Sequence, residues 1–136
     1  MLRLHPSVPK AVKFALKSDT LPDGTRVPRG CAVAYSAFAY GRDPRLWHNP
    51  LVFDPGRFVG KAEPSAFEYP VFNAGPRLCP GQRFALMEVK LVTSALLHAF
   101  DFELAEEHAG SYEATLLLPM SPGLVVKLTP RRNETK

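Results

Sequence analysis

One loop constrains the fold of this chain more than any other stretch. Segment 72–81 reads Phe-Asn-Ala-Gly-Pro-Arg-Leu-Cys-Pro-Gly and leads directly into a long apolar run, 83–100. Apolar residues occupy nearly every side of the helix that this run predicts, and such a helix belongs inside a larger body. The sequence therefore predicts a rigid loop carrying one cysteine, Cys79, at the start of a helix made for burial.

The residue types in the loop suit a metal-bound thiolate at Cys79. A thiol must be deprotonated to hold a metal, and a metal or a helix start favours that form. Pro80 is typical of a first helical turn. Gly75 and Gly81 allow tight turns or close approach to a flat cofactor, and Phe72 offers an apolar wall against water. The alternative is a buried structural cysteine in a Gly/Pro loop.

Five residues reproduce the pattern F-x-x-G-x-R-x-C-x-G: Phe72, Gly75, Arg77, Cys79 and Gly81. This pattern resembles the haem-thiolate loop of the cytochrome P450 monooxygenases, and chance would produce it in roughly one of 10^4 to 10^5 such chains. The resemblance implies that Cys79 is the axial ligand of the iron in haem b (iron protoporphyrin IX). It also implies that Arg77 binds a haem propionate and that Ala85 passes beneath the haem.

Three basic residues match further positions of the family. Lys13 resembles a site where many members place a propionate-binding arginine, and a solvated strand lysine is an equally good interpretation. Segment 2–6 is similar to the end of a helix with the motif E-x-x-R, so Arg3 would be its arginine, and the glutamate would fall before the first residue. Arg57 matches the arginine of a P-x-R-F segment. We expect Arg3 and Arg57 to converge as structural residues.

The resemblance also implies contacts with a lipophilic substrate. In the family, the chain near residues 7–12 passes the haem edge, and a hairpin near 116–120 reaches into the substrate pocket, although hairpin core is an equally good explanation for the latter. Candidate substrate residues are Val8, Pro9, Ala11, Leu117 and Leu118. Segments 6–9, 21–25 and 72–77 look like those of the plant and algal fatty-acid ω-hydroxylases, which points to a fatty acid.

We expect a mainly α fold with small β-hairpins and long coil, corresponding to the C-terminal (proximal) part of the P450 fold and incomplete. Residues 1–136 would form one haem-binding region, a fragment of a longer domain. Seven of the 14 prolines lie between Pro44 and Pro80, which predicts coil in that half. In the first half we expect a last helical turn at 1–9, then strands at 11–17 and 31–40 around a turn at 22–25. A short helix followed by coil is expected at 42–58, anchored by Trp47 and Phe53, and then a loop at 61–69. After the long helix we expect strands at 100–104 and 116–128, with a frayed end at 129–136.

Composition excludes several partners. The net charge of +4 is spread along the chain, so nucleic-acid binding is not indicated. No apolar run reaches the ~18 residues of a membrane span, and no targeting segment is visible. The second cysteine, Cys31, fits strand packing, and the absence of C-x-x-C pairs favours a reducing compartment.

The family activity is insertion of one oxygen atom of O2 into a C–H bond, with electrons from an NADPH-dependent reductase or another donor. The long distal helix of the family, with its oxygen-activating acid and alcohol, has no counterpart here. Our expectation is therefore a haem-binding portion that hydroxylates nothing alone. A truncated, inactive haem-binding or docking remnant is the alternative, and a purely structural domain is a third. The compartment is not indicated by the sequence, and full-length homologues are expected at the endoplasmic reticulum membrane.

Overall fold

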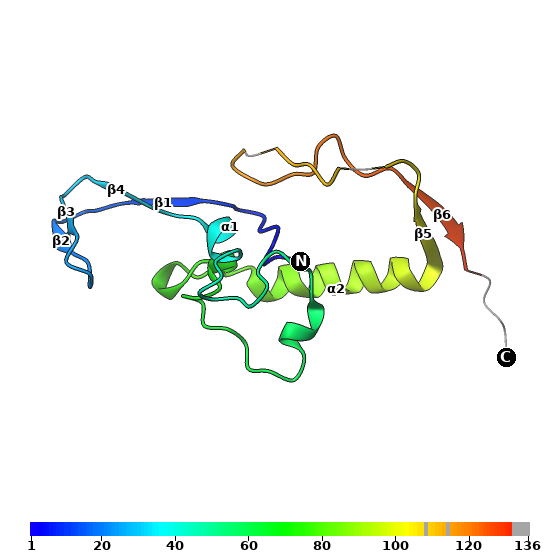
Figure 1. Ribbon diagram of the computed structural model, residues 1–136, viewed down its shortest axis with the longest axis horizontal. Coiled ribbons are helices and arrows are strands. Elements are labelled where there is room, and N and C mark those ends of the chain that lie inside the picture. Colours follow the sequence, from blue (N-terminus) through cyan, green and yellow to red (C-terminus); the bar gives the residue numbers. More distant parts are fainter. Residues whose placement is uncertain (108, 114, 132–136) are drawn as a thin grey trace.

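The computed structural model describes residues 1–107, 109–113 and 115–131. Figure 1 shows an elongated arrangement in which one long helix forms the axis and hairpins project beyond its two ends. The helices and strands are β1 (Ala11–Phe14), β2 (Asp19–Thr20), β3 (Arg26–Val27), β4 (Ala32–Tyr35), α1 (Ala37–Tyr40), α2 (Gln82–Ala99), β5 (Phe100–Leu104) and β6 (Val126–Pro130). Three short 3-10 turns lie at Pro55–Phe58, Pro70–Phe72 and Gly75–Arg77.

Helix α2 confirms the prediction for 83–100 to within one residue at each end. It begins after Gly81 and ends at Phe100, whose extended backbone passes directly into β5. None of its residues is buried, and the side chains of Phe84 and Leu91 are 65% and 69% exposed. The apolar surface that predicted burial is therefore uncovered within this chain.

The N-terminal hairpin is shorter than predicted. Strands β1 and β4 pair antiparallel from Ala11 opposite Tyr35 to Phe14 opposite Ala32, and β2 and β3 extend the hairpin toward the predicted turn at 22–25. The predicted strand 31–40 breaks at Ser36 because its side chain accepts a hydrogen bond from the Ala39 amide and caps α1. The half-buried face predicted for 11–17 is also wrong, since Phe14 is 68% exposed.

The proline-rich middle of the chain is coil, as predicted. Trp47 anchors it, with ring centroids 5.9 Å from those of Phe58 and Tyr69. Phe53 was expected to be a second anchor, but it is 64% exposed. A short helix followed by coil was expected at 42–58, but the order is the reverse: turns and coil come first, and the 3-10 turn Pro55–Phe58 ends the segment. The Asp54 carboxylate starts this turn by accepting a hydrogen bond from the Gly56 amide.

Strand β5 pairs antiparallel with β6, from Phe100 opposite Pro130 to Leu104 opposite Val126. The second tail strand was predicted at 116–128, whereas β6 begins ten residues later, at Val126. Between the strands the chain runs back over α2 as a long loop (Figure 1), closed by a bridge between Tyr112 and Met120. Thr129 belongs to β6 rather than to a frayed end, and residues 132–136 of that prediction lie outside the described residues.

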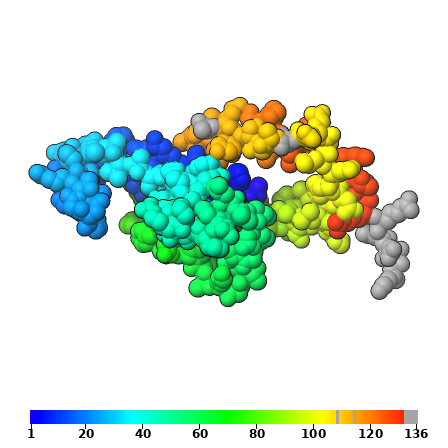
Figure 2. Space-filling model, viewed as in Figure 1, coloured from blue at the N-terminus to red at the C-terminus, as the bar shows by residue number. Residues whose placement is uncertain are grey.

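The chain encloses little core. Its accessible surface is 11274 Å², whereas a compact protein of its mass would expose about 7,000 Å². Among the described residues, the buried side chains are those of Leu4, Val27 and Ala37, together with Pro6, Pro70 and the charged Arg3. Figure 2 shows the resulting open outline, with the N-terminal hairpin projecting at one end and the chain between β5 and β6 forming a separate arm. The expectation of a mainly α chain is wrong for the described residues, because α1 and α2 hold only 4 and 18 residues, while the expected long coil and small hairpins make up most of the rest.

Gly41 is a point of close backbone approach. A Cβ atom at this position would lie 1.9 Å from the Arg3 carbonyl oxygen, a backbone atom that cannot move without displacing the N-terminal turn. We predict that Gly41→Ala lowers the free energy of unfolding by at least ~3 kcal/mol in urea denaturation. Gly56→Ala is the matched control, because its Cβ meets only the Asp54 side chain, at 3.0 Å, and should cost within ~1 kcal/mol. Equal effects of the two changes would contradict this account.

Candidate functional site

The cysteine loop is closed by one backbone hydrogen bond. Two 3-10 turns, Pro70–Phe72 and Gly75–Arg77, each start at or next to a proline and set the path of the chain into α2. The Cys79 amide then donates to the Phe72 carbonyl at 2.8 Å, so the two ends of the loop meet. The structure therefore has the loop predicted at a helix start, while the rigidity of this loop stays a prediction.

The thiol of Cys79 is free and partly exposed beside the first turn of α2. A Cβ on Gly81 would lie 3.8 Å from the Cys79 sulfur, and a Cβ on Gly75, whose φ is +61°, would meet no heavy atom within 4 Å. Among the described residues, no group of three or more His, Cys, Asp or Glu side chains could hold a metal ion. Cys79 thus offers one sulfur donor with open space along the glycine side of its loop.

The other predicted residues of the loop are gathered around Cys79 by the chain itself. Phe72 and Ala85 are half-buried, and the Ala85 amide donates to the Gly81 carbonyl at 2.9 Å. Arg77 is exposed, and its guanidinium makes no hydrogen bond to any residue that the structure describes. Its five donors are therefore available to a ligand.

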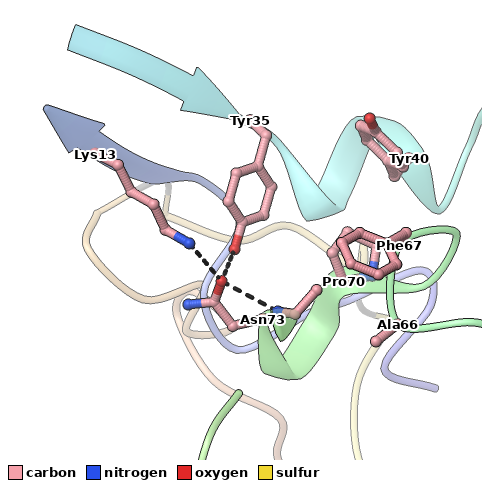
Figure 3. Close-up of a pocket in the computed structure, with 8 residues that line it drawn as sticks. Lys13, Tyr35, Tyr40, Ala66, Phe67, Pro70 and Asn73 are labelled. Carbon is pink, nitrogen blue, oxygen red and sulfur yellow. Dashed lines mark hydrogen bonds between the residues drawn. The ribbon is translucent and has the colours of Figure 1, made fainter. Parts of the chain in front are cut away.

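Lys13 is drawn to this loop by a residue that sequence reasoning missed, Asn73. The Asn73 side-chain oxygen accepts hydrogen bonds from the Lys13 ammonium at 3.0 Å and from the Tyr35 hydroxyl at 2.7 Å (Figure 3). The Lys13 ammonium also lies 5.7 Å from the Tyr35 ring centroid, and partial burial raises the pKa of Tyr35. An asparagine in a glycine-rich loop was the available clue, because asparagine tolerates positive φ.

A cavity of about 240 Å³ adjoins this network without reaching Cys79. Figure 3 shows Tyr40 and Phe67 on the side of the cavity away from Lys13. The cavity lining is Lys13, Tyr35, Tyr40, Ala66, Phe67, Pro70, Asn73 and Ala74. Most of its wall is thus aromatic or aliphatic, with one cation at its edge.

Arg3 and Arg57 converge, as predicted. The buried Arg3 guanidinium donates to the carbonyls of Gly41 and Pro50 at 2.5 Å and of Val52 at 2.8 Å. Arg57 donates to the same Val52 carbonyl at 3.4 Å, and its Nε is buried without a partner in the described part of the chain. Burial, and then repulsion from Arg57 and a third arginine, lowers the pKa of Arg3. Asp54 offsets part of this repulsion, but neither arginine forms an ion pair with a carboxylate in the described part of the chain.

That third arginine, Arg42, was not anticipated. Its guanidinium donates to the Leu4 carbonyl and lies 3.5 Å from the Phe38 ring centroid. Partial burial lowers the pKa of Arg42. Nothing in the local sequence distinguishes Arg42 from the other scattered basic residues, because its partners are more than thirty residues away in the chain or lie on α1.

The two predicted substrate segments meet. The Leu118 amide donates to the Ser7 carbonyl at 3.1 Å, which brings 116–120 against the chain that carries Val8 and Pro9. Tyr112 fixes the same loop through ring contacts with His5, at 6.2 Å between centroids, and Phe38, at 5.6 Å. Val8 and Leu117 are exposed, Pro9 and Leu118 are half-buried, and Ala11 is half-buried in β1 opposite Tyr35.

Comparison with known proteins connects this arrangement to one family. The family described as Cytochrome P450 matches residues 1–126. The chain is 39% identical to Cytochrome P450 704C1 of Pinus taeda over 97% of this chain and 26% of that protein. It is 35% identical to Cytochrome P450 86B1 of Arabidopsis thaliana over 96% of this chain and 24% of that protein. The chain thus spans about a quarter of the length of these relatives.

Solved structures agree with the sequence comparison. The structure described as retinoic acid bound cyanobacterial CYP120A1 superposes with a TM-score of 0.85 at 29% identity, covering 96% of this chain and 30% of that one. A cytochrome P450DA heme domain mutant gives the same TM-score at 25% identity. The fold is therefore a partial P450 fold. Among the described residues, no helix is long and apolar enough to cross a membrane.

His5 makes the contact with the tail loop sensitive to pH. Partial burial, and then the positive charges of Arg42 and the chain N-terminus, lower the pKa of His5 below its usual 6.5, although much of the residue remains exposed. The unfolded chain therefore binds more protons than the folded one, and stability should fall as pH decreases below about 6.5. Urea midpoints at about pH 7.5 and about pH 5.5 measure this, and His5→Gln should flatten the difference.

The matched control for this test is His48→Gln, a change at an exposed histidine. It should leave the pH dependence as it is in the parent chain. A parent chain whose midpoint does not move with pH, or a His5→Gln variant that keeps the full difference, would contradict the assignment to His5.

Proposed function

Because the chain belongs to the cytochrome P450 family, we propose that it binds haem b with the Cys79 thiolate as the protein ligand of the iron, as part of a monooxygenase acting on a lipophilic substrate. The observation that carries this proposal is the geometry of Cys79. Its sulfur stands beside the first turn of α2, in a loop closed by the 2.8 Å bond from the Cys79 amide to the Phe72 carbonyl.

The donor set suits a haem better than a bare metal ion. One thiolate provides too few ligands for a bare metal ion. Haem iron needs only axial ligands from the protein, because the porphyrin supplies the others. The open space at Gly75 and the small contact at Gly81 leave room for a flat group to approach the loop. Phe72, half-buried beside the loop, would keep water from the sulfur. The residues present therefore fit the group.

Two cations are available for the haem propionates. Arg77 has an unengaged guanidinium fork, which matches a carboxylate in a bidentate manner. The Lys13 ammonium has three donors, and its one hydrogen bond in the described chain goes to Asn73. Lys13 can thus hold Asn73 and a propionate at the same time. Ala85, six residues beyond Cys79 and without a long side chain, would let the porphyrin lie against α2.

Haem bound through a thiolate supplies reductive cleavage of O2, with donation from the sulfur assisting the break. The part of this chain would be to hold the sulfur, exclude water and seat the cofactor on its proximal side, with residues 1–136 acting as one haem-binding region. Electrons would come from an NADPH-dependent reductase or another donor. Since the relatives are about four times longer, activity of the whole protein would depend on residues outside this sequence.

We place the substrate contacts where 116–120 meets the chain after Pro6. Val8, Pro9, Leu117 and Leu118 present apolar side chains there, which suits a hydrocarbon chain such as that of a fatty acid. The retinoic acid bound to the cyanobacterial neighbour supports an apolar acid as the substrate class.

Arg3 and Arg57 are proposed as structural residues. Their guanidinium groups share the Val52 carbonyl, and the buried Nε of Arg57 has no partner in the described chain. A buried donor without an acceptor is costly, and two guanidinium groups side by side repel each other. A carboxylate at this point would satisfy both, which is the arrangement that the E-x-x-R resemblance implies.

The experiment that tests haem binding is spectroscopic. The chain is titrated with haem, reduced under carbon monoxide, and inspected for a Soret band near ~450 nm, as thiolate ligation predicts. Cys79→Ala should abolish the band because the sulfur is lost. Cys31→Ala, which removes the exposed cysteine of the N-terminal hairpin, is the matched control and should keep the band. A parent chain without the band, or a band that survives Cys79→Ala, refutes the proposal.

A second candidate function is non-catalytic: a haem-binding or protein-docking chain in which Cys79 still ligates the iron but no substrate is oxidised. The observation that favours it is the excess accessible surface, 11274 Å² in total, which includes the exposed apolar side of α2. Both candidates predict the Soret band. Turnover separates them once the residues outside this sequence are supplied, because NADPH-driven hydroxylation of a fatty acid with an added reductase is then expected only of the catalytic one.

A further inference from the structure

Asn73 holds a backbone conformation that asparagine rarely adopts. Its φ is 69° and its ψ is −174°, and this region of the backbone map is essentially restricted to glycine. Residues persist there only when their surroundings hold them in place, and they concentrate at functional sites. Asn73 lies six residues before Cys79, so its strained backbone belongs to the cysteine loop.

The side chain of Asn73 is what fixes it. Its oxygen accepts from the Lys13 ammonium at 3.0 Å, from the Tyr35 hydroxyl at 2.7 Å and from the adjacent Ala74 amide at 3.2 Å. An ammonium only donates, so the atom that faces Lys13 must be the amide oxygen rather than the nitrogen. Figure 3 shows the three bonds meeting at this oxygen. One of them carries a full charge, which makes it stronger than a neutral hydrogen bond.

The conformation of Asn73 bears directly on Cys79. The Phe72 carbonyl belongs to the peptide unit between Phe72 and Asn73, so rotation about φ of Asn73 turns this carbonyl relative to the rest of the loop. That carbonyl accepts the 2.8 Å hydrogen bond from the Cys79 amide. The strained φ thus aims the acceptor that closes the cysteine loop.

We propose that Asn73, clamped by Lys13 and Tyr35, is a positioning residue that sets the place of the Cys79 sulfur. Lys13 lies on β1 and Tyr35 ends β4, so the clamp ties the N-terminal hairpin to the cysteine loop across some sixty residues of sequence. The part of this inference that treats the sulfur as an iron ligand rests on the proposed function. The part that concerns closure of the cysteine loop does not depend on it.

Hydrogen exchange at the Cys79 amide tests the clamp without any cofactor. Asn73→Ala removes the acceptor and should speed this exchange roughly tenfold, while Tyr35→Phe removes one donor and should speed it roughly threefold. Asn73→Asp keeps an acceptor for both donors and should preserve the parent rate. Tyr40→Phe is the matched control: Tyr40 lines the same cavity, but its hydroxyl takes no part in the network, so the rate should not change.

Amides paired between β5 and β6 report whether a variant has unfolded as a whole. If Asn73→Ala also speeds exchange of the β5 and β6 amides, this variant has unfolded as a whole. Exchange of the Cys79 amide in the milder Tyr35→Phe variant is then the deciding measurement. The proposal is overturned if Cys79 exchange is the same in the parent, Asn73→Ala and Tyr35→Phe chains, or if Tyr40→Phe matches Tyr35→Phe.

Haem titration provides the second measurement. Loss of a residue that orients a metal ligand typically weakens metal binding 10- to 100-fold, so Asn73→Ala should lower haem affinity by roughly tenfold and Asn73→Asp should restore it. A parent chain that shows no band near ~450 nm refutes the proposed function and leaves the exchange result as the test of the clamp. A parent chain with the band, and an Asn73→Ala variant with equal haem affinity, refutes the positioning role alone.

Discussion

The hydrogen bond from the Cys79 amide to the Phe72 carbonyl is the interaction on which the site depends, because it brings together the two ends of a loop that belongs to no β-sheet. Prolines fix the two turns inside the loop, and α2 takes the chain away from it. The strained Asn73 backbone directs the Phe72 carbonyl, so the N-terminal hairpin, through Lys13 and Tyr35, takes part in holding the sulfur.

Away from this loop the chain is held by isolated charged and aromatic contacts rather than by a shared core. Arg3 ties the N-terminal turn to three carbonyls of the proline-rich coil, and Trp47 packs against Phe58 and Tyr69. Most apolar side chains of α2 remain exposed, and none is buried. Such a surface is normally buried, and the chain spans only about a quarter of the length of its relatives.

Local rules predicted much of this structure. Continuous apolar residues gave α2 its limits, and proline and glycine located the coil and the turn at 22–25. The same rules failed where distant contacts decide. Ser36 caps a helix inside an apparent strand, and β6 forms at 126–130 because those residues face β5, although 116–118 is the more apolar run. Phe14 and Phe53 look like core residues by type, yet no neighbour covers them.

The sequence by itself determined the chemistry of the site: which residue carries the sulfur, that it stands at a helix start, and which family pattern surrounds it. It also indicated that Arg3 and Arg57 converge. Only the tertiary structure decided that Asn73 accepts hydrogen bonds from Lys13 and Tyr35, that Arg42 lies near Arg3, and that Leu118 reaches Ser7. These contacts join residues tens of positions apart, and no periodicity or local propensity encodes them, because their energies exist only once the chain has brought both partners together.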